Sequence, residues 1–155
     1  MKFFFLFLLM TNFIFATELK LVGKGLLEYS IFKIDIYEVS YYKNSNNHTK
    51  LSLDYKIDVK KEYSLEGWKV GLENNIKDLA KYQDQISWIN RHTTTIKKGD
   101  RFSIEIKGDL VTLDLNNKMI ASKKDNLLAK IILLPWIGPN PVDQKLKNQI
   151  LAINP

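Results

Sequence analysis

Few residues in this chain are of the types that carry out chemistry on a substrate. The 155-residue sequence has no cysteine, which excludes a thiol nucleophile, a disulfide framework, an iron–sulfur cluster and a cysteine zinc site. Its two histidines, His48 and His92, are too few for a histidine-rich metal site or for a catalytic site built on two histidines. His48 belongs to a polar loop. His92 follows Arg91 near the end of a predicted helix, where a capping or solvent-facing role is expected.

The patterns that mark phosphate loops and nucleophile elbows do not occur. Gly23-Lys24-Gly25 has no third glycine and does not open a helix, so it predicts a turn. Ser64 lies in Ser64-Leu65-Glu66-Gly67, which is not a nucleophile elbow. Asp54 and Asp58 alternate with the apolar side of a predicted strand and are expected to face water, and no carboxylate pair has the spacing of a glycosidase. We therefore expect no metal and no cofactor.

Aromatic side chains are the remaining candidates for a functional site. The chain has three tryptophans, Trp68, Trp88 and Trp136, and seven tyrosines. One interpretation is that these rings only pack the core. The other is that some of them line a partly apolar cleft between helices and sheet, where tyrosine hydroxyls orient the polar end of an amphiphilic ligand. The space around Tyr37, Tyr55 and Trp136 is where the two interpretations differ.

The net charge of +6 does not indicate a nucleic-acid partner. Lysine supplies most of the 23 basic residues, which are scattered among 17 acidic ones, and Arg91 and Arg101 are the only arginines. Nucleic-acid-binding proteins usually cluster their basic residues and use arginine forks. We expect a solvated, lysine-rich surface and no nucleic-acid partner.

The N-terminal segment is typical of a secretory signal peptide. Lys2 is followed by an apolar run and a small residue, Ala16, and Asn12 interrupts the run. The run is short for a membrane span of about 20 residues. We expect a signal peptide over residues 1–16, a periplasmic or secreted domain over 17–155 and no membrane span after cleavage; a retained N-terminal anchor is the alternative.

Alternating apolar residues predict a sheet of about seven antiparallel strands. Residues 51–59 alternate most regularly, and residues 32–42 change parity midway, which predicts either a bulge or burial on both faces. Short strands on either side of the 23–25 turn and a three-strand meander from 102 to 121 complete the sheet.

Apolar residues at helical spacing predict two helices, over residues 64–76 and 79–89. A shorter helix is predicted over 127–134, with Asp125 or Asn126 as its cap and Pro135 at its end, and a last short helix over 142–151. Gly67 and Gly71 weaken the first helix by about 1 kcal/mol each and suggest a close approach to the sheet. Because the strands are grouped, the pattern indicates an α+β fold with helices on one face of the sheet.

Three stretches of the sequence share their order and spacing with a known family. They are 21–25 with 32–42, 51–55, and 133–147 (LLPWIGPNPVDQKLK), and Lys97-Lys98-Gly99-Asp100 precedes the meander. Together they resemble the bacterial chalcone isomerase-like domain, a secreted relative of plant chalcone isomerases and fatty-acid-binding proteins. The resemblance covers nearly all of residues 18–152 and implies an open-faced β-sandwich of the chalcone isomerase type.

The resemblance also shows where this chain departs from the enzymes. Plant chalcone isomerases use an arginine near the first strands and a threonine on the strand that follows. Leu26 stands where relatives often have the arginine, and Tyr37 stands about where the threonine would be. Charge develops on the carbonyl oxygen of the reacting ketone, so the reaction needs a cation and hydrogen-bond donors there. The resemblance therefore implies a non-catalytic member, and the ligand-binding residues that we expect are Tyr37, Tyr55, Trp68, Trp136 and Leu26.

Three functions follow as hypotheses. The first is a secreted protein that binds a small amphiphile, such as a fatty acid or an aromatic compound, between sheet and helices. An interior filled by side chains, with no cleft, would count against it. Arg91 or Arg101 beside the phenol groups would contradict the loss of the catalytic cation. The second is an intramolecular lyase of the chalcone isomerase type that depends on Tyr37. The third is an envelope protein-interaction module that uses the exposed face of the sheet, which a large apolar patch would support.

Overall fold

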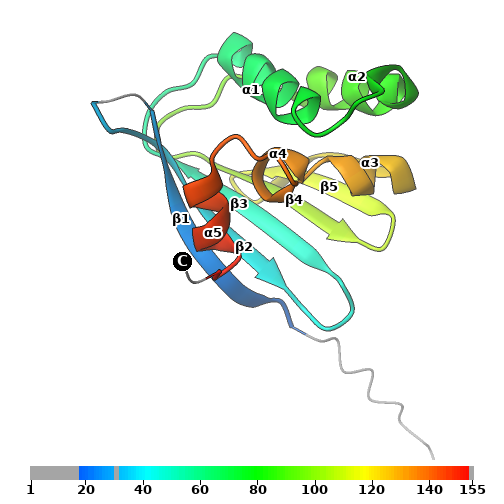
Figure 1. Cartoon of the computed structure of the whole chain (residues 1–155), viewed down its shortest axis with the longest axis horizontal. Helices are drawn as coiled ribbons and strands as arrows, with labels where there is room; N and C mark the ends of the chain where they lie inside the picture. The colour runs from blue at the N-terminus through cyan, green and yellow to red at the C-terminus, as the bar shows by residue number, and fades with distance from the viewer. Residues whose placement is uncertain (1–17, 30–31, 154–155) are drawn as a thin grey trace, which may run out of the picture.

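The computed structural model describes residues 18–29 and 32–153 and contains one antiparallel sheet with helices (Figure 1). The six strands lie side by side in chain order, so each strand pairs with the next one along the sequence. They are β1 (Lys20–Tyr29), β2 (Ile34–Lys43), β3 (Thr49–Tyr55), β4 (Arg101–Lys107), β5 (Leu110–Leu115) and β6 (Lys118–Lys124). The predicted α+β class with an open antiparallel sheet is confirmed, with six strands in place of about seven.

The expected turn at Gly23-Lys24-Gly25 is wrong, and this error accounts for the extra strand. All three residues lie inside β1, which runs unbroken from Lys20 to Tyr29. The glycines are there because α5 (Gln144–Ile150) packs against this strand: a Cβ atom on Gly25 would lie 2.7 Å from a methyl group of Leu146, and one on Gly23 would meet the backbone of Gln149. The glycines permit a close approach of two elements and do not reverse the chain.

The parity change in β2 comes from a β-bulge, one of the two predicted alternatives. Leu27 pairs with Tyr37, but the next residue, Glu28, pairs with Asp35, so Ile36 is the extra residue on β2. Beyond the bulge Tyr37, Val39 and Tyr41 are buried. The meander is also confirmed: tight turns at Gly108 and at Asn116-Asn117, all with positive φ, connect its three strands.

The remaining helices lie on one side of the sheet (Figure 1). They are α1 (Lys61–Glu73), the 3₁₀ helix η1 (Leu79–Tyr82), α2 (Gln83–His92), α3 (Asn126–Ile131) and α4 (Leu134–Ile137). Asp125, one of the two predicted caps, caps α3: its carboxylate accepts hydrogen bonds from the backbone N–H groups of Leu127 and Leu128. Pro135 does not end that helix; it lies in the first turn of α4, where its missing N–H costs nothing.

The core lies between the helices and one face of the sheet. Its fully buried members include Val39, Leu51, Leu53, Ile104 and Leu113 from strands, and Leu128, Leu146 and Ile150 from helices. Within the described residues, no helix is long and apolar enough to cross a membrane. The predicted signal peptide over 1–16 lies outside the described residues.

Candidate ligand-binding site

Four of the five predicted ligand-binding residues come together between the sheet and the helices. Tyr37 on β2 pairs directly with Tyr55 at the end of β3, and their ring centroids are 5.2 Å apart. Trp68 on α1 meets Trp136 on α4 edge to face, with centroids 5.1 Å apart and an interplanar angle of 88°. The indole N–H of Trp136 donates a hydrogen bond of 3.1 Å to the Tyr37 hydroxyl and joins the two pairs. We call Tyr37, Tyr55, Trp68 and Trp136 the aromatic cluster.

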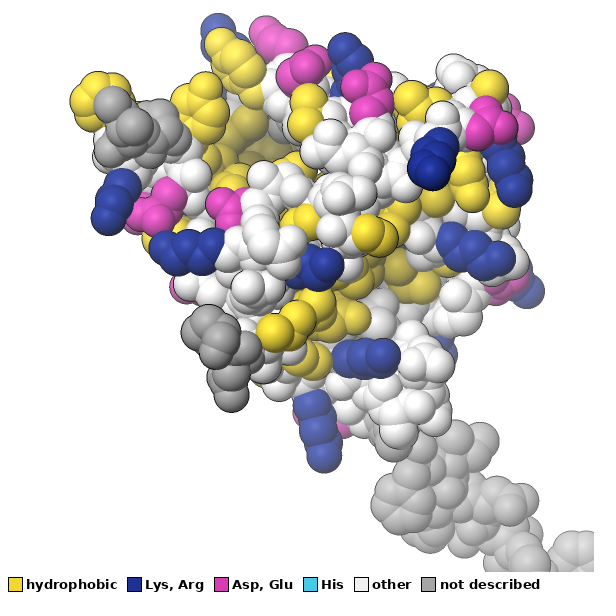
Figure 2. All heavy atoms as spheres, viewed as in Figure 1, with side chains coloured by type: hydrophobic (Ala, Val, Ile, Leu, Met, Phe, Trp, Pro, Cys, Tyr) yellow, Lys and Arg dark blue, Asp and Glu magenta, His cyan; other side chains and the backbone are white. Residues whose placement is uncertain are grey.

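The aromatic cluster is packed closely, with a small remainder at the surface. The exposed fractions are 9% for Tyr37, 8% for Trp68 and 7% for Trp136, and Tyr55 is partly buried. Figure 2 shows hollows with hydrophobic floors on this side of the molecule, one of them between the β1–β2 end of the sheet and α1. The cluster is therefore a closely packed wall of rings in edge-to-face contact, with little surface exposed.

Leu26 is not part of this wall. It pairs with Glu38 on the face of the sheet that points away from the helices, and it is partly exposed. Successive residues of a strand point to opposite faces. Its neighbour Leu27 therefore takes the position on the helix side, opposite Tyr37, and packs against the core.

Both tyrosines of the aromatic cluster are neutral hydrogen-bond donors at ordinary pH. Burial raises the pKa of Tyr37 to about 12; the hydrogen bond from Trp136 acts in the opposite direction, and the charge of Asp143 adds to the rise. Burial also raises the pKa of Tyr55, and the neighbouring Tyr37 adds to the effect. Within the described part of the chain, the Tyr37 hydroxyl accepts from Trp136 and donates to no protein acceptor. Its proton is available to an oxygen atom of a ligand.

Ser64 is a further polar group that the sequence motifs did not identify. It lies on α1 four residues before Trp68, which places both side chains on the same helix face. Its hydroxyl is buried and has no hydrogen-bond partner among the described residues. A buried hydroxyl without a partner costs about 1–3 kcal/mol, so a ligand that supplied one would be favoured. The four-residue spacing from Trp68 was the signal in the sequence.

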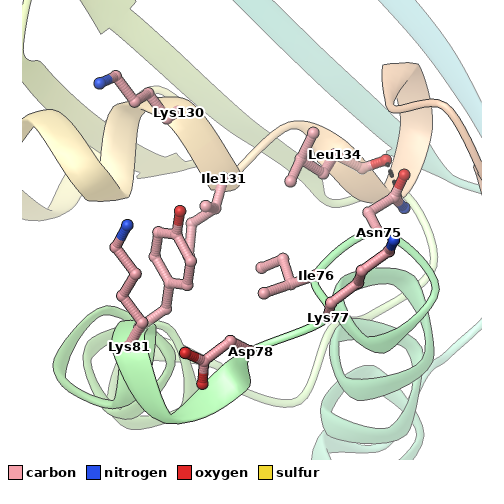
Figure 3. A pocket seen from close by; sticks show the side chains of 9 residues that line it. Asn75, Ile76, Lys77, Asp78, Lys81, Lys130, Ile131 and Leu134 are labelled. Atoms are coloured by element: carbon pink, nitrogen blue, oxygen red, sulfur yellow. Dashed lines mark hydrogen bonds between the residues drawn. The ribbon is translucent and has the colours of Figure 1, made fainter.

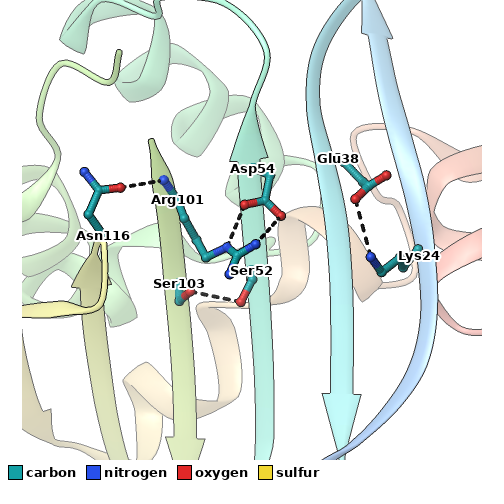
Figure 4. Close-up of polar contacts among 7 residues, drawn as sticks. All are labelled: Lys24, Glu38, Ser52, Asp54, Arg101, Ser103 and Asn116. Carbon is teal, nitrogen blue, oxygen red and sulfur yellow. Dashed lines mark hydrogen bonds and ion pairs between the residues drawn. The ribbon is translucent and has the colours of Figure 1, made fainter. Parts of the chain in front are cut away.

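Neither arginine lies beside the aromatic cluster. The Arg101 guanidinium donates two hydrogen bonds to Asp54, 2.6 and 3.1 Å long, on the face of the sheet away from the helices (Figure 4). Arg91 is exposed and lines a groove between α1 and α2. Asp54 was expected to face water; it lies on this exposed face, where it forms an ion pair with Arg101.

The face of the sheet away from the helices is polar. Figure 4 shows the ion pair between Lys24 and Glu38, 3.6 Å long, and the hydrogen bond of 2.9 Å between the hydroxyls of Ser52 and Ser103. His48 lies nearby, and its ring Nε2 is hydrogen-bonded to the Glu105 carboxylate at 2.6 Å. Over the described residues, no group of three or more histidine and acidic side chains is placed to hold a metal ion.

A contact between α1 and α4 positions Trp136. A Cβ atom on Gly71 would lie 2.5 Å from the Pro135 side chain, so the two helices touch where α1 has no side chain. We had expected Gly71 to approach the sheet, but it approaches α4. Asn75 reinforces the contact, because its amide donates to the carbonyls of Gly71 and Asn140, both at 2.8 Å.

Two pockets open elsewhere among the helices. One, of about 420 Å³, lies between the end of α1, η1, α3 and α4 (Figure 3). The other is a groove of about 650 Å³ between α1 and α2, with Leu65, Leu72 and Ile86 among its apolar lining residues. The aromatic cluster lines neither of them.

Comparison with known proteins identifies one family and a set of similar solved structures. The model of the chalcone isomerase-like family matches residues 11–152. A fatty-acid binding protein of Arabidopsis thaliana has a similar structure, with a TM-score of 0.68 and 14% sequence identity over 86% of each chain. A search of curated proteins finds no match.

Proposed function

Because the chain belongs to the chalcone isomerase-like family, we propose that it is a non-catalytic member that binds a small amphiphile at the aromatic cluster, between sheet and helices. The fold relative is a fatty-acid binding protein, and its fold is compatible with this role. The ligand class is a fatty acid or an aromatic compound with an oxygen atom at one end.

The observation that carries the proposal is the Tyr37 hydroxyl. It is held by Trp136, lies within a wall of aromatic rings and has a proton that no described protein group accepts. The rings bind the apolar body of a ligand, and the phenol donates to its carbonyl or carboxyl oxygen. The unpartnered Ser64 hydroxyl, on the same face of α1 as Trp68, is a second donor for that oxygen.

The positions of the arginines support a binding role over a lyase role. Cyclisation of a chalcone places negative charge on the carbonyl oxygen, which requires a cation close by. Arg101 is engaged with Asp54 on the opposite face of the sheet, and Arg91 lies in the α1–α2 groove. The polar, ion-paired face of the sheet also gives less support to a protein-interaction module built on an apolar patch there.

The place of action that we propose is outside the cytoplasm. The support is the sequence pattern of residues 1–16, a lysine followed by an apolar run and a small residue. Fractionation of cells that express the full chain, followed by mass spectrometry of the N-terminus, tests this proposal. A mature protein that begins at Thr17 in the exported fraction is expected, and an intact N-terminus in the cytosol would contradict it.

Ligand binding is tested with the fluorescent probe N-phenyl-1-naphthylamine and its displacement by decanoic acid or by a chalcone. We expect the probe to bind and both competitors to displace it. Tyr37→Phe should weaken competitor binding by about two- to tenfold, the worth of one hydrogen bond. Tyr42→Phe, on the opposite face of the sheet, is the matched control and should leave affinity unchanged. If neither competitor displaces the probe, or if both variants bind alike, the proposal fails.

Enzyme activity is measured on the same protein. We expect chalcone cyclisation at the spontaneous rate. Turnover above that rate that is lost in Tyr37→Phe would replace the binding proposal by the lyase.

A further inference from the structure

The pocket of about 420 Å³ drawn in Figure 3 is separate from the aromatic cluster. Its apolar lining residues are Ile76 and Ile131, which are buried, together with Leu134 and the partly buried ring of Tyr82. Leu134 is in α4, the helix whose Trp136 belongs to the aromatic cluster. The volume lies in the range of about 300–1,000 Å³ that small-molecule sites occupy.

Three exposed lysines surround this apolar lining. Lys77 and Lys81 come from the segment around η1, and Lys130 comes from α3, so two separate elements supply the cations. Figure 3 shows Lys81 and Lys130 at the same end of the pocket. Asp78 is the one carboxylate among the lining residues, so the pocket carries excess positive charge.

Asp78 is the only acidic residue that lines the pocket, and it forms no ion pair with these lysines among the described residues. In the part of the chain that the structure describes, none of the three forms an ion pair, whereas Lys24, Lys50, Lys97, Lys123, Lys124 and Lys145 all do. The Lys81 ammonium instead lies 5.8 Å from the centre of the Tyr82 ring. Like charges that gather without a partner repel one another, and a bound anion relieves that repulsion.

One wall of the pocket is held rigidly before any ligand binds. The side-chain amide of Asn75 donates to the carbonyls of Gly71, Leu134 and Asn140, and its oxygen accepts from the backbone N–H of Asn140. Asn75 thus ties the end of α1 to α4 and to the loop that follows α4. A wall that does not reorganise on binding lowers the entropic cost of holding a ligand.

We propose that this pocket is a second binding site, specific for a small anionic amphiphile. The carboxylate or sulfonate group lies between Lys81 and Lys130, and the ring or chain covers Ile76, Ile131 and Leu134. This site is independent of the aromatic cluster, which presents neutral phenol donors.

A pair of probes that differ by one charged group tests this proposal. 1-Anilinonaphthalene-8-sulfonate carries the anionic group, and N-phenyl-1-naphthylamine is the same ring system without it. We expect the double variant Lys81→Glu/Lys130→Glu to weaken binding of the sulfonate probe at least tenfold and to leave the neutral probe unchanged. In the wild-type protein, a rise in salt from about 0.05 to 0.5 M should weaken only the sulfonate probe, because salt screens exposed charges.

The double variant Lys43→Glu/Lys107→Glu is the matched control. Both lysines are exposed, line neither pocket, and give the same change in net charge. Circular dichroism and the urea midpoint establish that both double variants are folded. Equal weakening in both variants would show a general charge effect, and unchanged affinity in Lys81→Glu/Lys130→Glu would show binding elsewhere; either result overturns the proposal. Weaker binding of decanoic acid or of a chalcone in Tyr37→Phe, by contrast, concerns only the aromatic cluster.

Discussion

Two glycines of α1 provide a test of how this helix holds α4 in place. Gly67 and Gly71 lie one turn apart in the interior of the helix. An added Cβ atom at Gly67 meets nothing within 4 Å, whereas at Gly71 it would lie 2.5 and 2.8 Å from the Cβ and Cγ atoms of Pro135. The same substitution therefore changes helix propensity at both sites and packing at only one.

The magnitudes follow from these two effects. Replacement of an interior helix glycine by alanine gains about 1 kcal/mol, so Gly67→Ala should raise the free energy of unfolding by that amount. At Gly71 the same gain is opposed by overpacking, which costs about 1–3 kcal/mol. The proline ring is rigid and its Cα atom is only 3.0 Å from the new Cβ, which places the cost in the upper part of that range. Gly71→Ala should be destabilising by about 1–2 kcal/mol net.

Urea unfolding followed by tryptophan fluorescence measures both variants. We expect the midpoint of Gly67→Ala to rise and that of Gly71→Ala to fall at constant slope. Because Trp136 follows Pro135 and packs on Trp68, the native fluorescence of Gly71→Ala should change as well, while that of Gly67→Ala should not. If Gly71→Ala is as stabilising as Gly67→Ala, the close approach of α1 and α4 does not position the aromatic cluster, and the reasoning is refuted.

Three further predictions concern other contacts. Tyr37→Phe leaves the buried N–H of Trp136 without its acceptor and should lower the free energy of unfolding by about 1–3 kcal/mol, measured by urea denaturation; an unchanged midpoint would contradict this. Asp125→Ala removes the cap of α3 and should cost about 0.5–2 kcal/mol at pH 7. Burial acts to raise the pKa of Asp125, but hydrogen bonds outweigh it and lower the pKa from 3.8 to about 2. The stability that the charged carboxylate adds is therefore present above pH 4 and is lost as the pH falls through 2. In acid denaturation curves, the difference between Asp125→Ala and the wild type should shrink over that interval. Gly23→Ala places a methyl group against the backbone of Gln149 and should lower the thermal midpoint by several degrees, whereas no shift would mean that α5 is not packed there.

Local patterns predicted the elements that repeat a simple period. The meander of β4 to β6 was predicted because its strands alternate strictly and its turns contain glycine and asparagine. A cap at Asp125 or Asn126 was predicted because a polar side chain before an apolar run commonly caps a helix, and Asp125 is the cap. Both signals act over a few residues, so no distant contact is needed to interpret them.

Other residues have local patterns with more than one use. Gly23 and Gly25 are residue types typical of a turn, but they lie in β1. They are glycines because α5 lies too close to this strand for a side chain. Pro135 was expected to end a helix, but it lies in the first turn of α4. The residues that contact these positions lie more than 60 residues away in the sequence: α5 contacts Gly23 and Gly25, and Gly71 of α1 contacts Pro135. A local pattern does not specify such distant contacts.

The candidate site divides in the same way. Tyr37, Tyr55, Trp68 and Trp136 were predicted to bind a ligand between sheet and helices, and the structure brings their side chains together. Leu26 was assigned by resemblance alone, and strand alternation next to Leu27, which pairs with Tyr37, places it on the opposite face of the sheet. The three lysines of the second pocket come from segments about 50 residues apart, and no spacing in the sequence indicated that they meet.

By itself the sequence determined the fold class, the grouping of strands and helices, and the absence of cysteine-based chemistry, because composition and periodicity act through residues that are close along the chain. Only the tertiary structure decided that the Tyr37 hydroxyl accepts from Trp136 and donates to no other described residue. It also decided that Arg101 binds Asp54 on the far face of the sheet, and that Lys81 and Lys130 line one pocket. These are properties of pairs of residues from different elements. Their distances depend on how closely the helices approach the sheet and one another, which is set by packing at positions such as Gly71.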